Sequence, residues 1–199
     1  MGLVKDEIRV RLTFTEPILG SSSGNKDLHR DFIASKGPDA KTREEEVAAL
    51  GEDEVEYKEM TVFPRTEDGR PMFWDYQIRG FFKSACKALN ANDPGHKLAA
   101  YKTKIDTLVF VKERRIPING TVTASPLQRP LRAETAQGPR VALASSEEIE
   151  AGATCEFTIQ LLADGFKQRV LDWLEYGQFV GMGQWRGGSF GRFTYEIIK

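Results

Sequence analysis

A glycine-rich segment near the C-terminal end carries the residue types best suited to bind an anion. Within residues 181–192, the glycines and arginines are Gly181, Gly183, Gly187, Gly188, Gly191, Arg186 and Arg192. Glycine permits positive φ and lets backbone amides approach a phosphate, while arginine donates two parallel hydrogen bonds to it. A tight turn between a helix and a strand also needs glycine, but fewer of them. The segment therefore predicts contact with a phosphate-bearing ligand.

A second group of cations lies on a helix predicted at residues 76–90. Its apolar residues recur at helical spacing on one side, whereas Arg79, Lys83 and Lys87 recur every fourth residue on another side. At this spacing no acid lies between the three cations, although an ordinary solvated helix face is the alternative. We expect this side and the glycine-rich segment, through Arg79 and Arg186, to converge on one groove for a sugar-phosphate chain.

Candidate catalytic residues gather in one short segment that contains Asp27, His29 and Asp31. A carboxylate beside a histidine can hold a divalent ion or relay a proton. The spacing matches no established ligand pattern, and a solvated loop explains it equally well. The sequence carries no serine-based triad and no metal-ligand cluster, so we expect no cofactor and no catalysis.

Charge is distributed unevenly along the 199 residues, although the net charge is only −1. Residues 61–140 carry a net charge of +7, whereas residues 1–60 carry −5 and residues 141–199 carry −3. A basic middle between acidic flanks predicts a localised anion-binding surface, and chance clustering on solvated faces is the alternative. The near-neutral total argues against a protein that coats DNA nonspecifically.

The cysteines and the lengths of the apolar runs indicate in which cellular compartment the protein is expected. Cys86 falls on a predicted helix and Cys155 on the inward phase of a predicted strand, so we expect two buried, reduced thiols rather than a disulfide or a nucleophile. No run approaches the roughly 18 apolar residues of a membrane span, and the first ten residues lack a signal-peptide core. These features predict a cytoplasmic protein that does not contact a membrane.

The predicted elements describe a single α+β domain, residues 1–199, with two insertions. Strands are expected at residues 7–14, 105–112, 153–161 and 193–198, helices at 76–90 and 166–180, and a short hairpin joining 61–63 to 72–74. The insertions are an acidic, helical stretch at about 21–60 and an arm at 119–152, either a long β-hairpin or a flexible segment. Without them the order is βαββαβ, the ferredoxin-like (RRM-like) plan of an antiparallel sheet with two helices on one face.

Three segments resemble the RAMP superfamily, the repeat-associated proteins of CRISPR effector complexes. The glycine-rich loop of that family is resembled by the pattern G-x-G-x-x-R-x-G-x-x-G-R, which lies between a helix and the last strand. Residues 77–83 resemble the start of the family's first helix. Residues 14–20 resemble its first strand where that strand runs into a loop. The resemblance implies guide-RNA binding along a basic surface. The residues it assigns to that surface are Arg79, Lys83, Arg186 and Arg192, with Arg129, Arg132 and Arg140 on a thumb-like arm.

The sequence therefore predicts non-catalytic binding of single-stranded nucleic acid, with RNA favoured and single-stranded DNA as the alternative, by a subunit similar to those of an effector backbone. Its expected partners are the nucleic acid and copies of itself or other effector subunits. The acidic insertion has no counterpart in the family and suggests a stand-alone relative from a phage or mobile element. The alternatives are a protein-interaction module that engages or mimics a CRISPR component and a metal-dependent ribonuclease.

Overall fold

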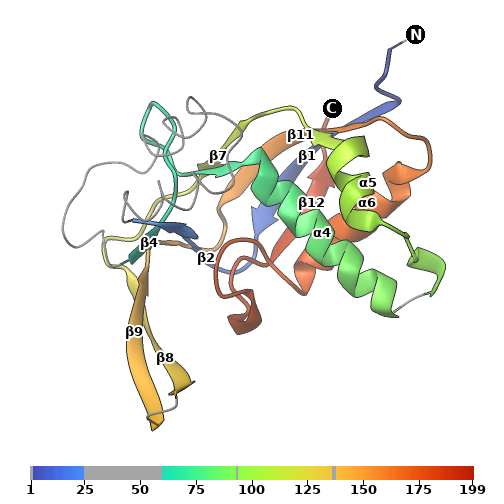
Figure 1. Cartoon of the computed structure of the whole chain (residues 1–199). Helices are drawn as coiled ribbons and strands as arrows, with labels where there is room; N and C mark the ends of the chain where they lie inside the picture. The colour runs from blue at the N-terminus through green and yellow to red at the C-terminus, as the bar shows by residue number, and fades with distance from the viewer. Residues whose placement is uncertain (1, 25–59, 93, 136–137) are drawn as a thin grey trace, which may run out of the picture.

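The computed structural model describes residues 2–24, 60–92, 94–135 and 138–199 (Figure 1). The acidic helix expected within residues 21–60, and with it Asp27, His29 and Asp31, lies almost entirely outside the described residues. The helices are α4 (Asp75–Asn92), α5 (Tyr101–Leu108) and α6 (Phe166–Glu175), with short 3₁₀ turns at Pro94–His96, Tyr176–Gln178 and Arg186–Gly188. The strands are β1 (Asp6–Phe14), β2 (Ile18–Leu19), β3 (Ser22–Ser23), β4 (Met60–Val62), β5 (Met72–Trp74), β6 (Val109–Val111), β7 (Arg115–Asn119), β8 (Leu127–Thr135), β9 (Gly138–Ser146), β10 (Glu148–Ile149), β11 (Thr154–Leu161) and β12 (Phe193–Ile197).

The largest sheet is antiparallel and has the strand order β12-β1-β11-β7-β5, with β6 also pairing to β11. Its two long central strands, β1 and β11, pair from Asp6 opposite Leu161 to Thr13 opposite Thr154. Both alternate apolar and polar residues, so each buries every second side chain. The α+β class with an antiparallel sheet, expected from the sequence, is confirmed.

Helices α4, α5 and α6 lie against one face of this sheet and enclose the main core (Figure 1). Phe82 of α4 packs on Trp173 of α6, with ring centroids 5.8 Å apart. Phe81 of α4 meets Phe193 of β12 edge to face, at 5.1 Å. Helix α4 is therefore fixed on both sides, and its remaining flanks are available to neighbouring loops.

Cys86 and Cys155 are both free and buried, in agreement with the sequence prediction. Burial raises the pKa of both thiols, most strongly that of Cys155, because the apolar surroundings disfavour the thiolate. None of the helices in the part of the chain described here is long and apolar enough to cross a membrane.

Two predicted elements differ in the structure. The strand expected at 105–112 is strand only at its end, because Tyr101, Ile105 and Leu108 recur at helical spacing and pack against the core from α5. The hairpin expected between 61–63 and 72–74 does not form a ladder. Instead β4 pairs with β3 and β9, and β5 pairs with β7, while a single bridge joins Arg65 to Pro71.

The arm expected at 119–152 is a β-hairpin rather than an irregular segment. Strands β8 and β9 pair along their whole length, from Leu127 opposite Ser146 to Thr135 opposite Gly138. The hairpin projects away from the main sheet, and its base joins the small sheet β3-β4-β9-β8 (Figure 1). The side chains of Arg132 and Arg140 lie outside the described part of this hairpin.

Candidate nucleic-acid interface

The glycine-rich loop runs from the end of α6 to β12 and folds tightly on itself. Met182 donates its backbone N–H to the Gly191 carbonyl, at 2.9 Å, and a Cβ at Gly181 would lie 2.0 Å from the Gly191 carbonyl carbon. Gly191 and Gly183 also have positive φ, at 70° and 85°. The packing of the loop therefore explains these three glycines without any ligand, so their number alone is weaker support for anion binding than the sequence suggested.

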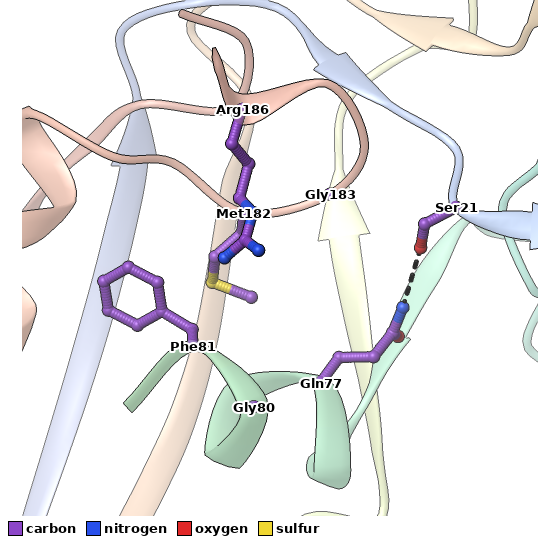
Figure 2. Close-up of a pocket in the computed structure, with 7 residues that line it drawn as sticks. All are labelled: Ser21, Gln77, Gly80, Phe81, Met182, Gly183 and Arg186. Carbon is purple, nitrogen blue, oxygen red and sulfur yellow. Dashed lines mark hydrogen bonds between the residues drawn. The ribbon is translucent and has the colours of Figure 1, made fainter. Parts of the chain in front are cut away.

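A pocket lies between the glycine-rich loop and the first half of α4, and its volume is about 270 Å³. Figure 2 shows that both segments contribute side chains to it. The lining residues are Ser21, Gln77, Gly80, Phe81, Met182, Gly183 and Arg186. On α4 the spacing of Gln77, Gly80 and Phe81 places them on one flank of the helix.

Gln77 is held rigidly at the entrance of α4. Its Oε1 accepts a hydrogen bond from the backbone N–H of Trp74 at 2.8 Å, which satisfies a donor that the helix start would leave free. Its Nε2 donates to Ser21 Oγ at 3.0 Å, the bond drawn in Figure 2. This wall of the pocket is therefore fixed before any ligand arrives.

Arg186 is the charged residue of the pocket. Its side chain is exposed and extends from the loop beside Met182 toward α4 (Figure 2). Within the described residues no carboxylate forms an ion pair with it, in contrast to the arginines of the sheet. A guanidinium in this state keeps all its donors available for a phosphate or carboxylate of a ligand.

Gly80 forms the floor of the pocket within the interior of α4. A Cβ at this position would meet no heavy atom within 4 Å, so the fold itself does not require glycine here. Glycine inside a helix costs about 0.5–1 kcal/mol relative to alanine. Because Gly80 has no side chain, the backbone of α4 is accessible from the pocket at the point that faces the glycine-rich loop.

A second hollow adjoins the first and shares Gly183 and Arg186 with it. Its volume is about 590 Å³. The lining residues are Ser84, Tyr176, Val180, Gly183, Gln184, Trp185, Arg186 and Gly187. The two hollows together make a groove along one flank of α4, which we call the α4–loop groove.

The cations predicted on α4 lie on a different flank of the helix. Arg79 pairs with Asp75 at 3.1 Å, and Lys83 pairs with Asp106 of α5 at 2.5 Å. Neither residue lines the α4–loop groove, so the expectation that Arg79 and Arg186 share a groove is wrong. The physical reason is that Arg79 and Lys83 follow Gln77 by two and six residues, which turns them away from the loop. Lys87 is exposed farther along the helix.

Arg129, at the base of the arm, is buried rather than exposed. Its guanidinium carbon lies 4.9 Å from the centre of the Trp185 ring, and its Nη1 donates to Ser146 Oγ at 3.3 Å. Burial lowers the pKa of Arg129 because no described carboxylate compensates its charge. Ser146 Oγ donates in turn to Gln184 Oε1 at 2.8 Å. These contacts tie the arm to the glycine-rich loop.

The other residues predicted to bind nucleic acid differ in how far they are buried and in what they contact. Gly188 lies against the Trp185 ring, since a Cβ there would be 2.8 Å from an indole carbon. Arg192 is half-buried, and its Nε has no hydrogen-bond partner in the described part of the chain. No group of three metal-ligating side chains occurs in the described ranges. Roles in nucleic-acid binding for Arg79, Lys83, Lys87, Arg129, Arg132 and Arg192 stay predictions.

Sequence reasoning did not single out Gln77, Gly80 or Trp185. An interior glycine in a strongly amphipathic helix was the available signal for Gly80. Trp185 carried a weaker signal, as the only aromatic residue inside the first half of the glycine-rich segment. Their proximity depends on how the loop returns over α4, which no local pattern specifies.

Fold and site together define an α+β protein with a groove whose arginine has no ion-pair partner among the described residues, and a solved structure shares this fold. A chain from the cryo-EM structure of the Type III-B Cmr-beta bound to cognate target RNA superposes with a TM-score of 0.51 at 10% sequence identity, over 97% of this chain and 58% of that chain. A chain of a Type IV-B CRISPR complex gives a TM-score of 0.48 at 10% identity, over 97% and 90%. The chain thus spans little more than half the length of the first of these.

At this identity the likeness to the Cmr-beta chain shows a shared fold alone. No protein-family profile matches the sequence, and no curated protein matches it. The shared fold is compatible with the fold that the resemblance in the sequence implies.

Proposed function

We propose that this protein binds single-stranded nucleic acid, RNA in the first instance, as a RAMP-like subunit that holds the strand along its sugar-phosphate backbone. The observation that carries the proposal is Arg186, exposed and unpaired among the described residues, over a pocket floored by Gly80. The phosphate of one nucleotide binds Arg186, and its sugar lies against the open backbone of α4. Such contacts are independent of sequence and weaken with salt.

The topology supports the RAMP-like assignment. We assign β1, α4, β6 with β7, β11, α6 and β12 to the successive elements of a ferredoxin-like βαββαβ unit, and the strand order β12-β1-β11 with β6 and β7 beyond it supports this assignment. The projecting hairpin β8–β9 takes the place of the thumb-like arm. On this assignment its further partners are copies of itself or other subunits of an effector complex.

The opposite face of the sheet is a poorer surface for phosphate. There Arg11 bonds Glu156 at 2.7 Å and Glu196 at 2.8 Å, and Arg9 bonds Glu156 at 3.1 Å. The hydrogen bond from Arg11 lowers the pKa of Glu156, so both charges persist at neutral pH. A phosphate would have to displace these carboxylates, whereas at Arg186 it displaces no carboxylate of the described residues.

Fluorescence anisotropy with a labelled, unstructured RNA tests the proposal. Hydrogen bonds to charged groups contribute about 1.5–3 kcal/mol, and Arg186 is exposed, so Arg186→Gln should weaken binding about tenfold. The slope of log K against log salt between about 50 and about 200 mM should fall by about 0.7, the value for one phosphate contact on a single strand.

The matched control is Lys167→Gln, which removes one exposed cation of α6 that pairs with Asp6. It should leave affinity and salt slope unchanged. Equal losses in both variants would mean that only net charge matters, and the groove would lose its role. Absence of any RNA or DNA binding at low salt, together with a stoichiometric protein partner on purification, would select the protein-interaction module instead.

A further inference from the structure

The hollow beside Tyr176 has apolar side chains in its wall and a cation at its rim. Tyr176 and Val180 bound it from the segment after α6, Trp185 bounds it from the glycine-rich loop, and Ser84 bounds it from α4. Its volume is about 590 Å³, and it is open to solvent. Apolar and polar residues both line it, which suits a partly apolar group.

Trp185 is positioned at an energetic cost to the backbone. Its φ is 53°, in the left-handed region that side chains other than glycine rarely adopt, although glycines surround it in the loop. Phe190 stacks on the indole with ring centroids 5.1 Å apart, and the Arg129 guanidinium lies 4.9 Å from its centre. The indole therefore has contacts with two side chains, while the residue as a whole is 43% exposed.

Arg186 joins this hollow to the pocket over Gly80, because it lines both. An anion held by Arg186 therefore lies at the mouth of the apolar hollow. Among ligands with a phosphate, a nucleotide of a single strand carries a flat aromatic group one sugar away from that charge. The combination of cation and apolar wall therefore selects a nucleobase over a purely apolar or purely anionic occupant.

We propose that the hollow bounded by Ser84, Tyr176, Val180 and Trp185 is a base pocket, which takes one unstacked nucleobase of the strand whose phosphate Arg186 holds. This inference rests on the proposed function and adds that binding requires a base as well as a charged backbone. Bases in a duplex are paired and stacked, so the pocket accepts single strands only.

Intrinsic fluorescence tests the pocket in the unmodified protein. Trp74 and Trp173 are buried, at 1% and 2% exposure, so Trp185 is the one tryptophan that a bound base can contact. Titration with a uridine homopolymer should quench the emission, whereas an abasic ribose-phosphate strand of the same length and charge should not. The base-bearing strand should also bind more tightly than the abasic strand, because only a base can fill the hollow.

A variant pair tests the location. Ser84→Trp fills the hollow from α4, and it should reduce the affinity of the uridine strand to that of the abasic strand while leaving the abasic strand unaffected. The control is Lys167→Gln, which lies outside the lining of the hollow and should leave both affinities unchanged. Thermal melting verifies that each variant folds, and Val180→Phe replaces Ser84→Trp if that variant does not.

The outcomes separate this inference from the proposed function. Equal binding of uridine and abasic strands, weakened in Arg186→Gln, overturns the base pocket and leaves backbone binding intact. If the variants Ser84→Trp and Val180→Phe still bind the uridine strand more tightly than the abasic strand, the base binds elsewhere, and the base pocket is overturned as well. No binding of either strand at low salt overturns both proposals.

Discussion

Replacing Gly80 with alanine adds one methyl group to the floor of the α4–loop groove. Because a Cβ at this position meets no heavy atom within 4 Å, the substitution creates no clash in the folded state. Alanine is favoured over glycine inside a helix by about 0.8–1.0 kcal/mol, partly through the lower entropy of the unfolded chain. We therefore expect Gly80→Ala to raise the free energy of unfolding by about that amount.

Thermal unfolding followed by circular dichroism measures this gain. For a chain of 150–250 residues, about 1 kcal/mol corresponds to a rise of about 2–4 °C in Tm. The control is Gly177→Ala, where the new Cβ would lie 2.3 Å from the Phe193 ring. Overpacking of that kind costs typically about 1–3 kcal/mol, so the control should lower Tm.

Replacing Gly80 with alanine should weaken RNA binding even though it raises the free energy of unfolding. Anisotropy with single-stranded RNA should show a small loss for Gly80→Ala and a larger loss for Gly80→Leu, because the longer side chain occupies the space in front of Arg186. A destabilised Gly80→Ala would show that the floor of the pocket is not open, and the reasoning about the groove would be wrong. Unchanged RNA affinity in Gly80→Leu would remove the strand from this pocket.

Three further outcomes follow from buried groups. Trp185→Ala should destabilise the protein less in an Arg129→Met background than in the wild type, by about 0.5–2 kcal/mol in a double-mutant cycle, because the cation–π contact is then already lost. Burial raises the pKa of Glu147 above its ordinary 4.5 despite the nearby Arg65, so the folded state binds the proton of this carboxyl more tightly than the unfolded state does. The free energy of unfolding measured in urea should therefore fall as the pH rises from about 4.5 through the raised pKa. The variant Glu147→Gln should abolish this part of the pH dependence. A thiol reagent should label neither Cys86 nor Cys155 at mildly alkaline pH until the protein is unfolded, because both are buried and their raised pKa values keep them as thiols.

The sequence was most informative where one periodicity covered a whole element. Alternation over β1 and β11, and the apolar stripe of α4, predicted these elements close to their observed bounds. It was misleading at α5, where a helix of eight residues runs directly into a three-residue strand and the two periods overlap. It also paired β4 with β5 because they are neighbours in sequence, whereas β4 pairs with β9 far along the chain.

The candidate site was predictable only in part, for a related reason. The glycine-rich loop was identified as a site from its composition, but most of its glycines serve the close approach of the loop to itself. Which flank of α4 the loop covers depends on long-range packing through Phe81 and Phe193. A helix with cations on one flank and glycine on another offers two candidate faces, and the sequence analysis chose the more highly charged one.

The faces of this molecule differ in whether their cations are ion-paired with carboxylates, and this matters more for phosphate binding than the number of cations. The basic middle of the chain suggested a positive surface, yet Arg79 and Lys83 are each held by an aspartate. A cation already bonded to a carboxylate gains little from a phosphate, because one ion pair replaces another. Arg186 has no such competitor among the described residues, and the new contact there is a net gain. A net charge of −1 is therefore compatible with binding a polyanion, provided that cations without a carboxylate partner lie where the strand passes.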